Sequence, residues 1–239
     1  MQSEKLEWQS EYINYHNKNP FVAPGGSYQG TEIRLILEEL RRHGSPNIID
    51  FCYGTGRITT LLASKERNIL ALDQSHGSLL QINNQYCSPI CCIAQAAPIK
   101  GNWADCILFI QAFQYIPLEE HDVVLKELNR LLKKDGRLII STFCYDSIFL
   151  RASHILFKDR WKRDGVEFGS NGFRLPYHRF TKSELLTKLR DAGFEITSIR
   201  LLRNYPFDQI STNMDYLIAK SGLKLFGSHI IVHARKVGD

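Results

Sequence analysis

The feature that most constrains the fold of this 239-residue chain is a repeated change of apolar periodicity between residues 47 and 142. Short apolar runs without a polar face alternate there with segments of helical periodicity, as is typical of parallel strands buried on both faces. The predicted strands are Asn47 to Phe51, Ile69 to Leu72, Ile90 to Ala94, Ala104 to Ile110 and Arg137 to Thr142, and the predicted helices are Ile58 to Ser64, Ser75 to Asn84 and Glu119 to Leu132. This alternation predicts a Rossmann-like, doubly wound α/β sheet that is mostly parallel.

The flanking segments are predicted to cover and complete this sheet. They are an N-terminal helix near residues 3–19, a Pro- and Gly-rich loop from Pro20 to Gly30, a helix from Thr31 to Arg42, a helix from Lys182 to Ala192 ending at Gly193, and strands Phe194 to Arg203 and Ser228 to Ala234, which bring the sheet to seven. Residues 143–180 form an aromatic and basic insert that we interpret as a helical lid, with an inner apolar stripe.

The length and the 44% hydrophobic content indicate one domain over residues 1–239. We divide it into an N-terminal cap (1–30), a cofactor-binding core (31–142), a lid and acceptor insert (143–180) and closing helix and strands (181–239). No apolar run approaches the length of a membrane span, and the polar N-terminus does not resemble a secretory leader, so a cytoplasmic protein without a membrane partner is expected.

The charge and the cysteines bear on possible partners and on a metal site, although the charge alone does not choose a partner. A net charge of +5 falls short of a nucleic-acid-binding signature, so no nucleic acid partner is expected. The six cysteines include Cys87, Cys91 and Cys92, but no paired Cys or His run at a familiar zinc spacing accompanies them. We therefore expect free thiols and no metal site.

The strongest local signal is the glycine-bearing turn from Asp50 to Arg57, which lies directly between the first strand and a helix. Such a turn lets the backbone approach a ligand, and the helix N-terminus offers unpaired N–H groups. Asp73 ends the second strand, where a carboxylate can accept hydrogen bonds from ribose hydroxyls. A dinucleotide fingerprint read from Gly54 and Gly56 needs a small residue at position 59, where Thr59 stands, so a nucleoside cofactor other than NAD is favoured.

These residues resemble the class I S-adenosylmethionine-dependent methyltransferases, within them the small-molecule group of the ubiquinone-biosynthesis type. The family motif of an acidic residue and Gly-x-Gly-x-Gly is matched by Asp50, Gly54 and Gly56, with Asp73 at the ribose position. Further similar segments are Gln95 to Ile99 after the third strand, Phe113 to Pro117 after the fourth, Lys134 to Leu138, Phe180 to Leu185 and Asp191 to Phe194. The resemblance implies that S-adenosylmethionine is the cofactor and that Asp50, Cys52, Gly54, Gly56, Asp73, Gln74, Gln95, Ala96 and Gln111 contact it.

The chain departs from the family pattern at two positions. Cys52 stands where the family has its first glycine, so its side chain adds bulk beside the cofactor's methionine end. Gln95 replaces the usual acidic residue of the adenine turn, and its amide oxygen can still accept from the adenine amino group. A packing role for Cys52 is favoured over a nucleophilic one, because no base is identified beside it.

The acceptor side is predicted from fewer signals. His178, at the end of the insert, and Tyr115 are the candidate catalytic residues, since methyl transfer needs an aligned nucleophile and in some cases a base. His154 and His76 are weaker candidates, and His76 and His121 are expected to face solvent. We expect methyl transfer to a small molecule; the alternatives are an RNA or protein methyltransferase, or a relative of the fold that is inactive or catalyses another reaction.

Overall fold

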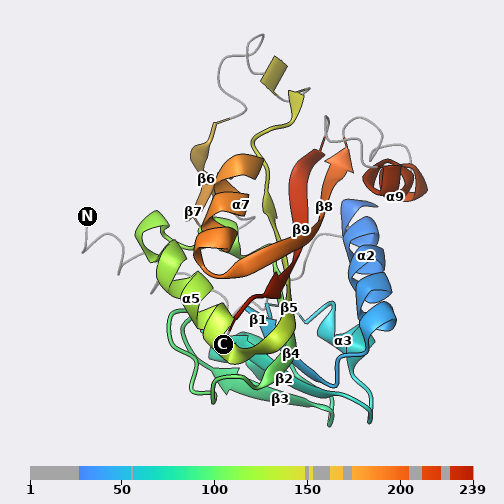
Figure 1. The fold of residues 1–239 in the computed structure, drawn as a ribbon, viewed down its shortest axis with the longest axis vertical. Coiled ribbons are helices and arrows are strands. Elements are labelled where there is room, and N and C mark those ends of the chain that lie inside the picture. Colours follow the sequence, from blue (N-terminus) through green and yellow to red (C-terminus); the bar gives the residue numbers. More distant parts are fainter. Residues whose placement is uncertain are drawn as a thin grey trace.

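A computed structural model describes residues 27–54, 56–148, 151–152, 162–168, 174–204, 212–221 and 227–238. Its main sheet has seven strands in the order β3-β2-β1-β4-β5-β9-β8 (Figure 1). The strands are β1 Asn47–Phe51, β2 Asn68–Asp73, β3 Cys87–Cys91, β4 Ala104–Ile110, β5 Leu132–Phe143, β8 Phe194–Asn204 and β9 Gly227–Lys236. β1 to β5 are parallel, and β9 is antiparallel to both β5 and β8. The predicted Rossmann-like sheet of seven strands is confirmed.

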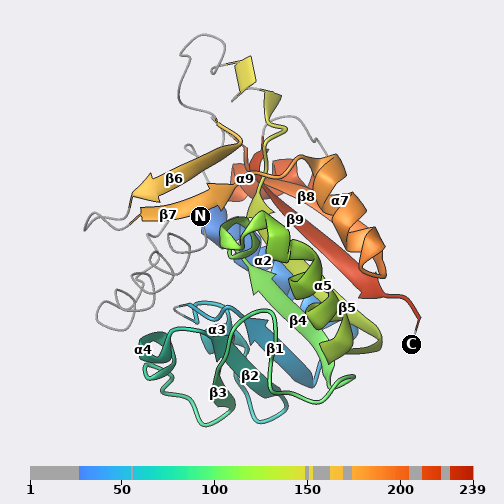
Figure 2. The same ribbon diagram turned by 90° about the vertical axis from the view of Figure 1, so that its left-hand side faces the viewer.

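Helices cover both faces of the sheet, as Figures 1 and 2 show. The helices and 3-10 turns are α2 Ser27–His43, α3 Thr59–Leu62, α4 His76–Leu79, η1 Phe113–Tyr115, η2 Leu118–Glu120, α5 His121–Leu131, α7 Lys182–Asp191 and α9 Thr212–Ser221. α2 and α9 pack on one face, through Ile36, Leu40 and Ala219. α5 and α7 pack on the other, through Leu128 and Leu189. Each face therefore has its own apolar core, which is why the central strands lack a polar side.

Several predicted boundaries are wrong. α2 begins at Ser27, so the end of the predicted loop from Pro20 to Gly30 is helical, and the helices predicted at 58–64 and 75–84 shorten to α3 and α4. The third strand is Cys87–Cys91 and not Ile90 to Ala94. β3 is an edge strand that pairs with β2, so it tolerates Pro89 and exposes three of its five residues. The apolar run used for the prediction mostly follows it. The helix predicted near 3–19 lies outside the described residues.

The insert differs most from its prediction. Its described part contains a two-stranded antiparallel hairpin, β6 Asp164–Phe168 and β7 Arg174–His178, where a helical lid was expected (Figure 2). The interpretation of residues near 148–162 as a lid helix falls mostly outside the described residues. An isolated β-bridge between Cys144 and Phe180 joins the two ends of the insert next to the main sheet. α9 was not predicted, although Tyr216 and Ala219 are buried at helical spacing.

Candidate functional site

A cavity lies at the carboxyl ends of β1, β2, β3 and β4, where ligands bind in doubly wound sheets. Residues from each of these strand ends and from the hairpin line it: Phe51, Cys52, Leu72, Asp73, Gln74, Cys92, Ile93, Ala94, Gln95, Ala112, Tyr115, Ile116, Pro117, Glu120 and Leu175. Cys52, Asp73, Gln74 and Gln95, which were predicted from the sequence, are thus brought together. Leu175 brings the hairpin of the insert into the lining of the cavity.

The glycine loop after β1 has three residues with left-handed backbone. Cys52, Gly54 and Gly56 have φ angles of 61°, 56° and 65°. A Cβ atom on Gly56 would overlap the Tyr53 ring, at 2.0 Å from its hydroxyl oxygen. A Cβ on Gly54 would meet no described atom closer than the Cys52 carbonyl oxygen at 4.0 Å. Gly56 is therefore required by packing. Gly54 is not crowded by the atoms around it, and neither glycine is among the residues that line the cavity.

Asp73 is buried and holds this loop in place. Its Oδ2 accepts from the Gly54 N–H at 2.8 Å, and its Oδ1 accepts from the Ser75 N–H at 2.8 Å. Burial raises the pKa of Asp73, although these backbone N–H groups oppose the rise. The Asp73 side chain is only 7% exposed, so it contributes to the fold of the loop as well as to the cavity. Ser75, and not Asp73, caps α4.

The adenine turn contains a pair that the sequence did not indicate. The Gln95 amide nitrogen donates to the Glu120 carboxylate, and both residues line the cavity. This contact orients the amide so that its oxygen remains an acceptor, as the adenine prediction requires. Glu120 lies 25 positions away in the chain, next to α5, and no local pattern points to it. Ala96, also predicted to contact the cofactor, is exposed and is not among the cavity residues.

Asp50 faces away from the cavity, under the start of α3. Its carboxylate accepts from the Thr59 hydroxyl, and burial raises its pKa to about 7. The proximity of Asp73 raises it further, while Arg57 opposes the rise. Asp50 thus joins the end of β1 to the start of α3 through Thr59. A direct contact between Asp50 and the cofactor stays a prediction.

Gln111 ends β4 with a left-handed backbone, at φ 55°. Its side-chain amide donates to Glu32 of α2 at 3.0 Å, and its backbone N–H donates to the Ser141 carbonyl at 2.9 Å. Glu32 also accepts from Arg57 and from the Ser141 hydroxyl. A buried polar cluster therefore joins α2 to the ends of β1, β4 and β5, beside the cavity residue Ala112.

An aromatic group lies on the acceptor side of the cavity. Tyr115 meets Phe143 edge to face at 5.8 Å between ring centroids, and Phe143 contacts Tyr177 at 5.7 Å and His229 at 5.1 Å. Burial lowers the pKa of His229 to about 3, so this ring is neutral. Tyr115 thus connects the cavity with a wall of rings from η1, β5, β7 and β9.

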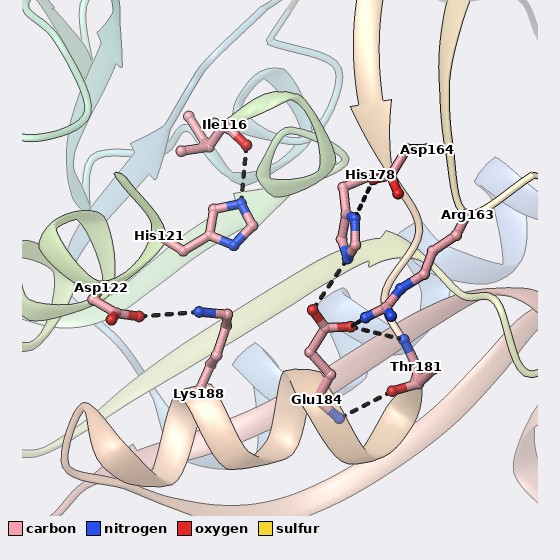
Figure 3. Close-up of polar contacts among 9 residues, drawn as sticks. All are labelled: Ile116, His121, Asp122, Arg163, Asp164, His178, Thr181, Glu184 and Lys188. Atoms are coloured by element: carbon pink, nitrogen blue, oxygen red, sulfur yellow. Dashed lines mark hydrogen bonds and ion pairs between the residues drawn. The ribbon is translucent and has the colours of Figure 1, made fainter. Parts of the chain in front are cut away.

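His178, the other predicted catalytic residue, lies in an ion-pair cluster and not among the cavity residues (Figure 3). Its Nδ1 is 2.6 Å from Asp164 Oδ1, and its Nε2 is 3.1 Å from Glu184 Oε1. Glu184 also accepts from Arg163 and forms a capping box with Thr181 at the start of α7. Both ring nitrogens are occupied, so this geometry joins the hairpin to α7 and leaves no nitrogen of His178 open to an acceptor.

His121 is fully buried, so the expectation that it faces solvent is wrong. Its Nε2 contacts the Ile116 carbonyl oxygen at 2.9 Å, and burial lowers its pKa to about 4. It packs against Phe113 at 4.4 Å between ring centroids, which identifies a core histidine. His76 is exposed, as predicted.

The six cysteines are free thiols, as predicted. Burial raises the pKa of the Cys52 thiol well above its ordinary value, and Asp73 and Asp50 raise it further. A protonated thiol is a poor nucleophile, which agrees with the packing interpretation. Among the described residues no group of His, Cys, Asp and Glu is arranged to hold a metal ion. No helix in the described part of the chain is long and apolar enough to cross a membrane.

Comparison with known proteins agrees with this geometry. The family described as "Methyltransferase domain" matches residues 49–140, the part of the sheet that carries the cavity. The structure is similar to 1,6-didemethyltoxoflavin-N1-methyltransferase from Burkholderia thailandensis, solved with 1,6-didemethyltoxoflavin and S-adenosylhomocysteine, with a TM-score of 0.64, 16% identity and coverage of 99% of this chain and 90% of that one. No curated protein sequence matches the chain.

Two further structures extend the comparison. A SAM-dependent methyltransferase from Methanosarcina mazei has a TM-score of 0.63 and 18% identity, covering 85% of this chain and 98% of that one. The (4+2)-cyclase SpnF has a TM-score of 0.61 and 18% identity, covering 98% and 95%. The chain thus has the class I methyltransferase fold, with a methyltransferase domain over residues 49–140. The predicted resemblance and class of enzyme are confirmed at the level of this domain, and the solved methyltransferases named above are SAM-dependent or hold S-adenosylhomocysteine.

The residues present fit this cofactor. The Asp73 carboxylate lines the cavity and, with about four acceptor positions, retains capacity for a ribose hydroxyl beyond its bonds to Gly54 and Ser75. Gln95 and Glu120 offer acceptors at the adenine end. Cys52 fits less well than the family's glycine, because its side chain lines the same cavity.

Proposed function

We propose that the protein transfers a methyl group from S-adenosylmethionine to a small-molecule acceptor. The observation that carries this proposal is the continuity of one cavity from the nucleoside residues Asp73 and Gln95 to Tyr115 and Leu175. The hairpin residue Leu175 lines the same concave, mostly apolar cavity, and a concave apolar site suits a small molecule better than a polymer.

The chain's own residues would position the reactants. The bound cofactor supplies an electrophilic methyl group on a sulfonium. Asp73 and the Gln95–Glu120 pair would hold its nucleoside, and the apolar walls Phe51, Leu72 and Ile116 would exclude water. Tyr115 would orient the acceptor, since its ring is fixed against Phe143 and its residue lines the cavity.

Tyr115→Phe tests this role of the hydroxyl. The ring packing against Phe143 is preserved, so the affinity for S-adenosylhomocysteine should remain within about twofold of the wild type. The rate of methyl transfer should fall by about 10- to 100-fold, measured in single-turnover assays. An unchanged rate would remove Tyr115 from the catalytic assignment.

The acceptor class is tested by labelling. The protein is incubated with S-adenosylmethionine carrying a radioactive methyl group and with a cell extract separated into small molecules, RNA and protein. Incorporation into the small-molecule fraction is expected, with Asp73→Ala as the control for cofactor dependence. Incorporation into RNA or protein instead would favour the alternative methyltransferase functions.

A second candidate function is a reaction other than methyl transfer. It is favoured by Cys52 in the glycine loop and by the similarity over 98% of the chain to SpnF, a cyclase. Binding of S-adenosylmethionine without label transfer to any fraction, and with the cofactor recovered intact, would support this candidate.

A further inference from the structure

A buried histidine links the β6–β7 hairpin to α7. His178 is the last residue of β7, and its side chain is 7% exposed. Its Nδ1 is 2.6 Å from Asp164 Oδ1 of β6, and its Nε2 is 3.1 Å from Glu184 Oε1 of α7. The ring therefore lies between two carboxylates from different elements, as Figure 3 shows.

These two contacts indicate the protonation state of the ring. An ionised carboxylate only accepts hydrogen bonds, so each ring nitrogen must carry a proton to bind its carboxylate. A neutral imidazole has one N–H, whereas an imidazolium has two. The geometry is thus complete only in the imidazolium. Loss of one proton would leave a nitrogen lone pair facing a carboxylate oxygen.

The charged groups around the ring favour its positive form. Arg163, which precedes β6, donates to Glu184. Lys188 of α7 pairs with Asp122 of α5 at 3.1 Å (Figure 3). With Asp164, three carboxylates surround two fixed cations, so a positive ring balances the charge. Burial acts to raise the pKa of Glu184, but the Arg163 hydrogen bond and the charge of the ring hold it below its ordinary value.

His121 of α5 is the other titratable group facing the ring among the described residues, at 6.3 Å between ring centroids. Burial lowers the pKa of His121 to about 4, so this ring is neutral near pH 7 and adds no charge. Phe180 covers His178 edge to face at 4.8 Å. Histidine is the residue type that ordinarily changes charge between about pH 5 and 8. Within this cluster, His178 is therefore the group that responds to pH in that range.

The same hairpin contributes to the cavity. Leu175, three residues before His178, lines the cavity, and Tyr177 meets Phe143 of the aromatic wall at 5.7 Å. Because side chains alternate along a strand, Leu175 and Tyr177 lie on one face of β7 and His178 lies on the other. The contact of β7 with α7 on one face thus helps to place Leu175 on the other.

We propose that His178, as an imidazolium, is a pH-dependent latch that holds the β6–β7 hairpin against α7 and Leu175 in the cavity wall. The latched hairpin binds the ring proton more tightly than a released hairpin, because only the latched one brings Glu184 to the ring. The latch is therefore complete at low pH and weakens as the pH rises and the proton is lost. Its release would speed the exchange of ligands with the cavity.

Hydrogen exchange of the β7 amides tests the latch without any ligand. The protection factor, which is the intrinsic exchange rate divided by the measured rate at the same pH, reports how often the hairpin opens. Wild-type protection should fall about three- to tenfold between about pH 5.5 and about pH 8.5. Protection of β1 in the same samples separates this local opening from any change in global unfolding.

His178→Gln removes the titration and keeps a side chain of similar length. Its hairpin should have the lower protection at both pH values, with less than about a twofold difference between them. Asp164→Asn is the second variant in case His178→Gln does not fold, since the Asp164 side chain is 65% exposed. Removing that negative charge should move the loss of protection to lower pH, because the imidazolium is stabilised less.

His43→Gln is the matched control. His43 Nε2 contacts Glu39 Oε1 at 3.1 Å on α2, so the variant removes a histidine–carboxylate contact from a helix that does not carry the latch. It should leave hairpin protection unchanged at each pH. Equal protection of wild type and His178→Gln at every pH, or an unchanged pH profile in Asp164→Asn, would overturn the latch.

The effect on the cavity is measured with S-adenosylhomocysteine, and this part rests on the proposed function. Its dissociation rate in stopped-flow displacement should rise at least about twofold with pH in the wild type and stay constant in His178→Gln. The same pH dependence in both proteins would overturn the control of the cavity by the latch. Binding at neither pH would overturn the proposed function, whereas hydrogen exchange, which needs no ligand, still decides the latch.

Discussion

Replacing Cys52 with glycine tests how the chain tolerates a departure from the glycine motif. Cys52 has a left-handed backbone, with φ 61°, which costs a non-glycine residue about 1–2 kcal/mol. Glycine removes this cost but loses about 0.5–1 kcal/mol more chain entropy on folding. It also loses the partly buried side chain, at about 0.8 kcal/mol per buried CH₂-sized group. These terms nearly cancel, so the free energy of unfolding of Cys52→Gly should stay within about 1 kcal/mol of the wild type.

Cys52→Ala separates the backbone term from the side-chain term. Alanine loses the sulfur but keeps the Cβ and therefore the strain, so we expect Cys52→Gly to be more stable than Cys52→Ala by about 0.5–1 kcal/mol. Urea unfolding with equal m-values measures this difference. An alanine variant at least as stable as the glycine variant would refute the argument from backbone strain.

The same two variants test the thiol against the cofactor. Because Cys52 lines the cavity as a protonated thiol, removing it should preserve or increase the affinity for S-adenosylhomocysteine in calorimetric titration. Loss of affinity in both variants, with folding intact, would mean that the sulfur contacts the ligand and that the site is adapted to cysteine.

Three further substitutions address the other site residues. Asp73→Ala should lower both the melting temperature and the cofactor affinity. The backbone N–H groups of Gly54 and Ser75 would each lose an acceptor, at a cost of about 1–3 kcal/mol. An unchanged affinity would exclude the ribose contact, and an unchanged melting temperature would exclude the structural role of the bond to Gly54. Asp50→Asn should flatten the pH dependence of the free energy of unfolding. Because the pKa of Asp50 is raised in the folded state, its contribution to stability is greatest below about pH 4. That contribution is lost as the pH rises to about 7, by at most about 4 kcal/mol. Equal pH profiles for variant and wild type in urea unfolding would contradict this. His178→Ala should lower the free energy of unfolding by about 1–2 kcal/mol with turnover retained, because its ring joins Asp164 to Glu184. A 100-fold loss of turnover without loss of stability would restore His178 as a catalytic base.

The central strands could be predicted at residue level because their apolar runs are buried on both faces. β1 and β4 begin and end where the sequence indicated. The ends of the short helices could not be predicted in this way. In the segment expected to be helical from Ser75 to Asn84, Gly77 and the Asn83–Asn84 pair lower the helical propensity, and α4 ends at Leu79. The pairing of β6 with β7 was not predicted, because the insert was interpreted as helical.

The site also contains residues that the sequence could predict and residues that it could not. Residues on the strand ends, such as Cys52 and Asp73, follow from the order of strands and turns. Glu120 and Glu32 do not, because their roles depend on contacts with Gln95 and Arg57, each 25 positions away in the chain. Helical periodicity places Glu32 on α2 but carries no information about which strand ends it meets.

The carboxyl ends of two neighbouring strands, β1 and β4, carry strained backbone. Cys52 follows β1 and Gln111 follows β4, and both have left-handed backbones without being glycine. Such conformations persist where surrounding contacts enforce them, and they concentrate at functional sites. Gln111 is fixed by its backbone bond to Ser141 and by its amide bond to Glu32, so the cluster that orients Arg57 also holds the strained end of β4. Since β1 and β4 are adjacent and the cavity lies at their carboxyl ends, the strain lies on both sides of the crevice in which doubly wound sheets bind ligands.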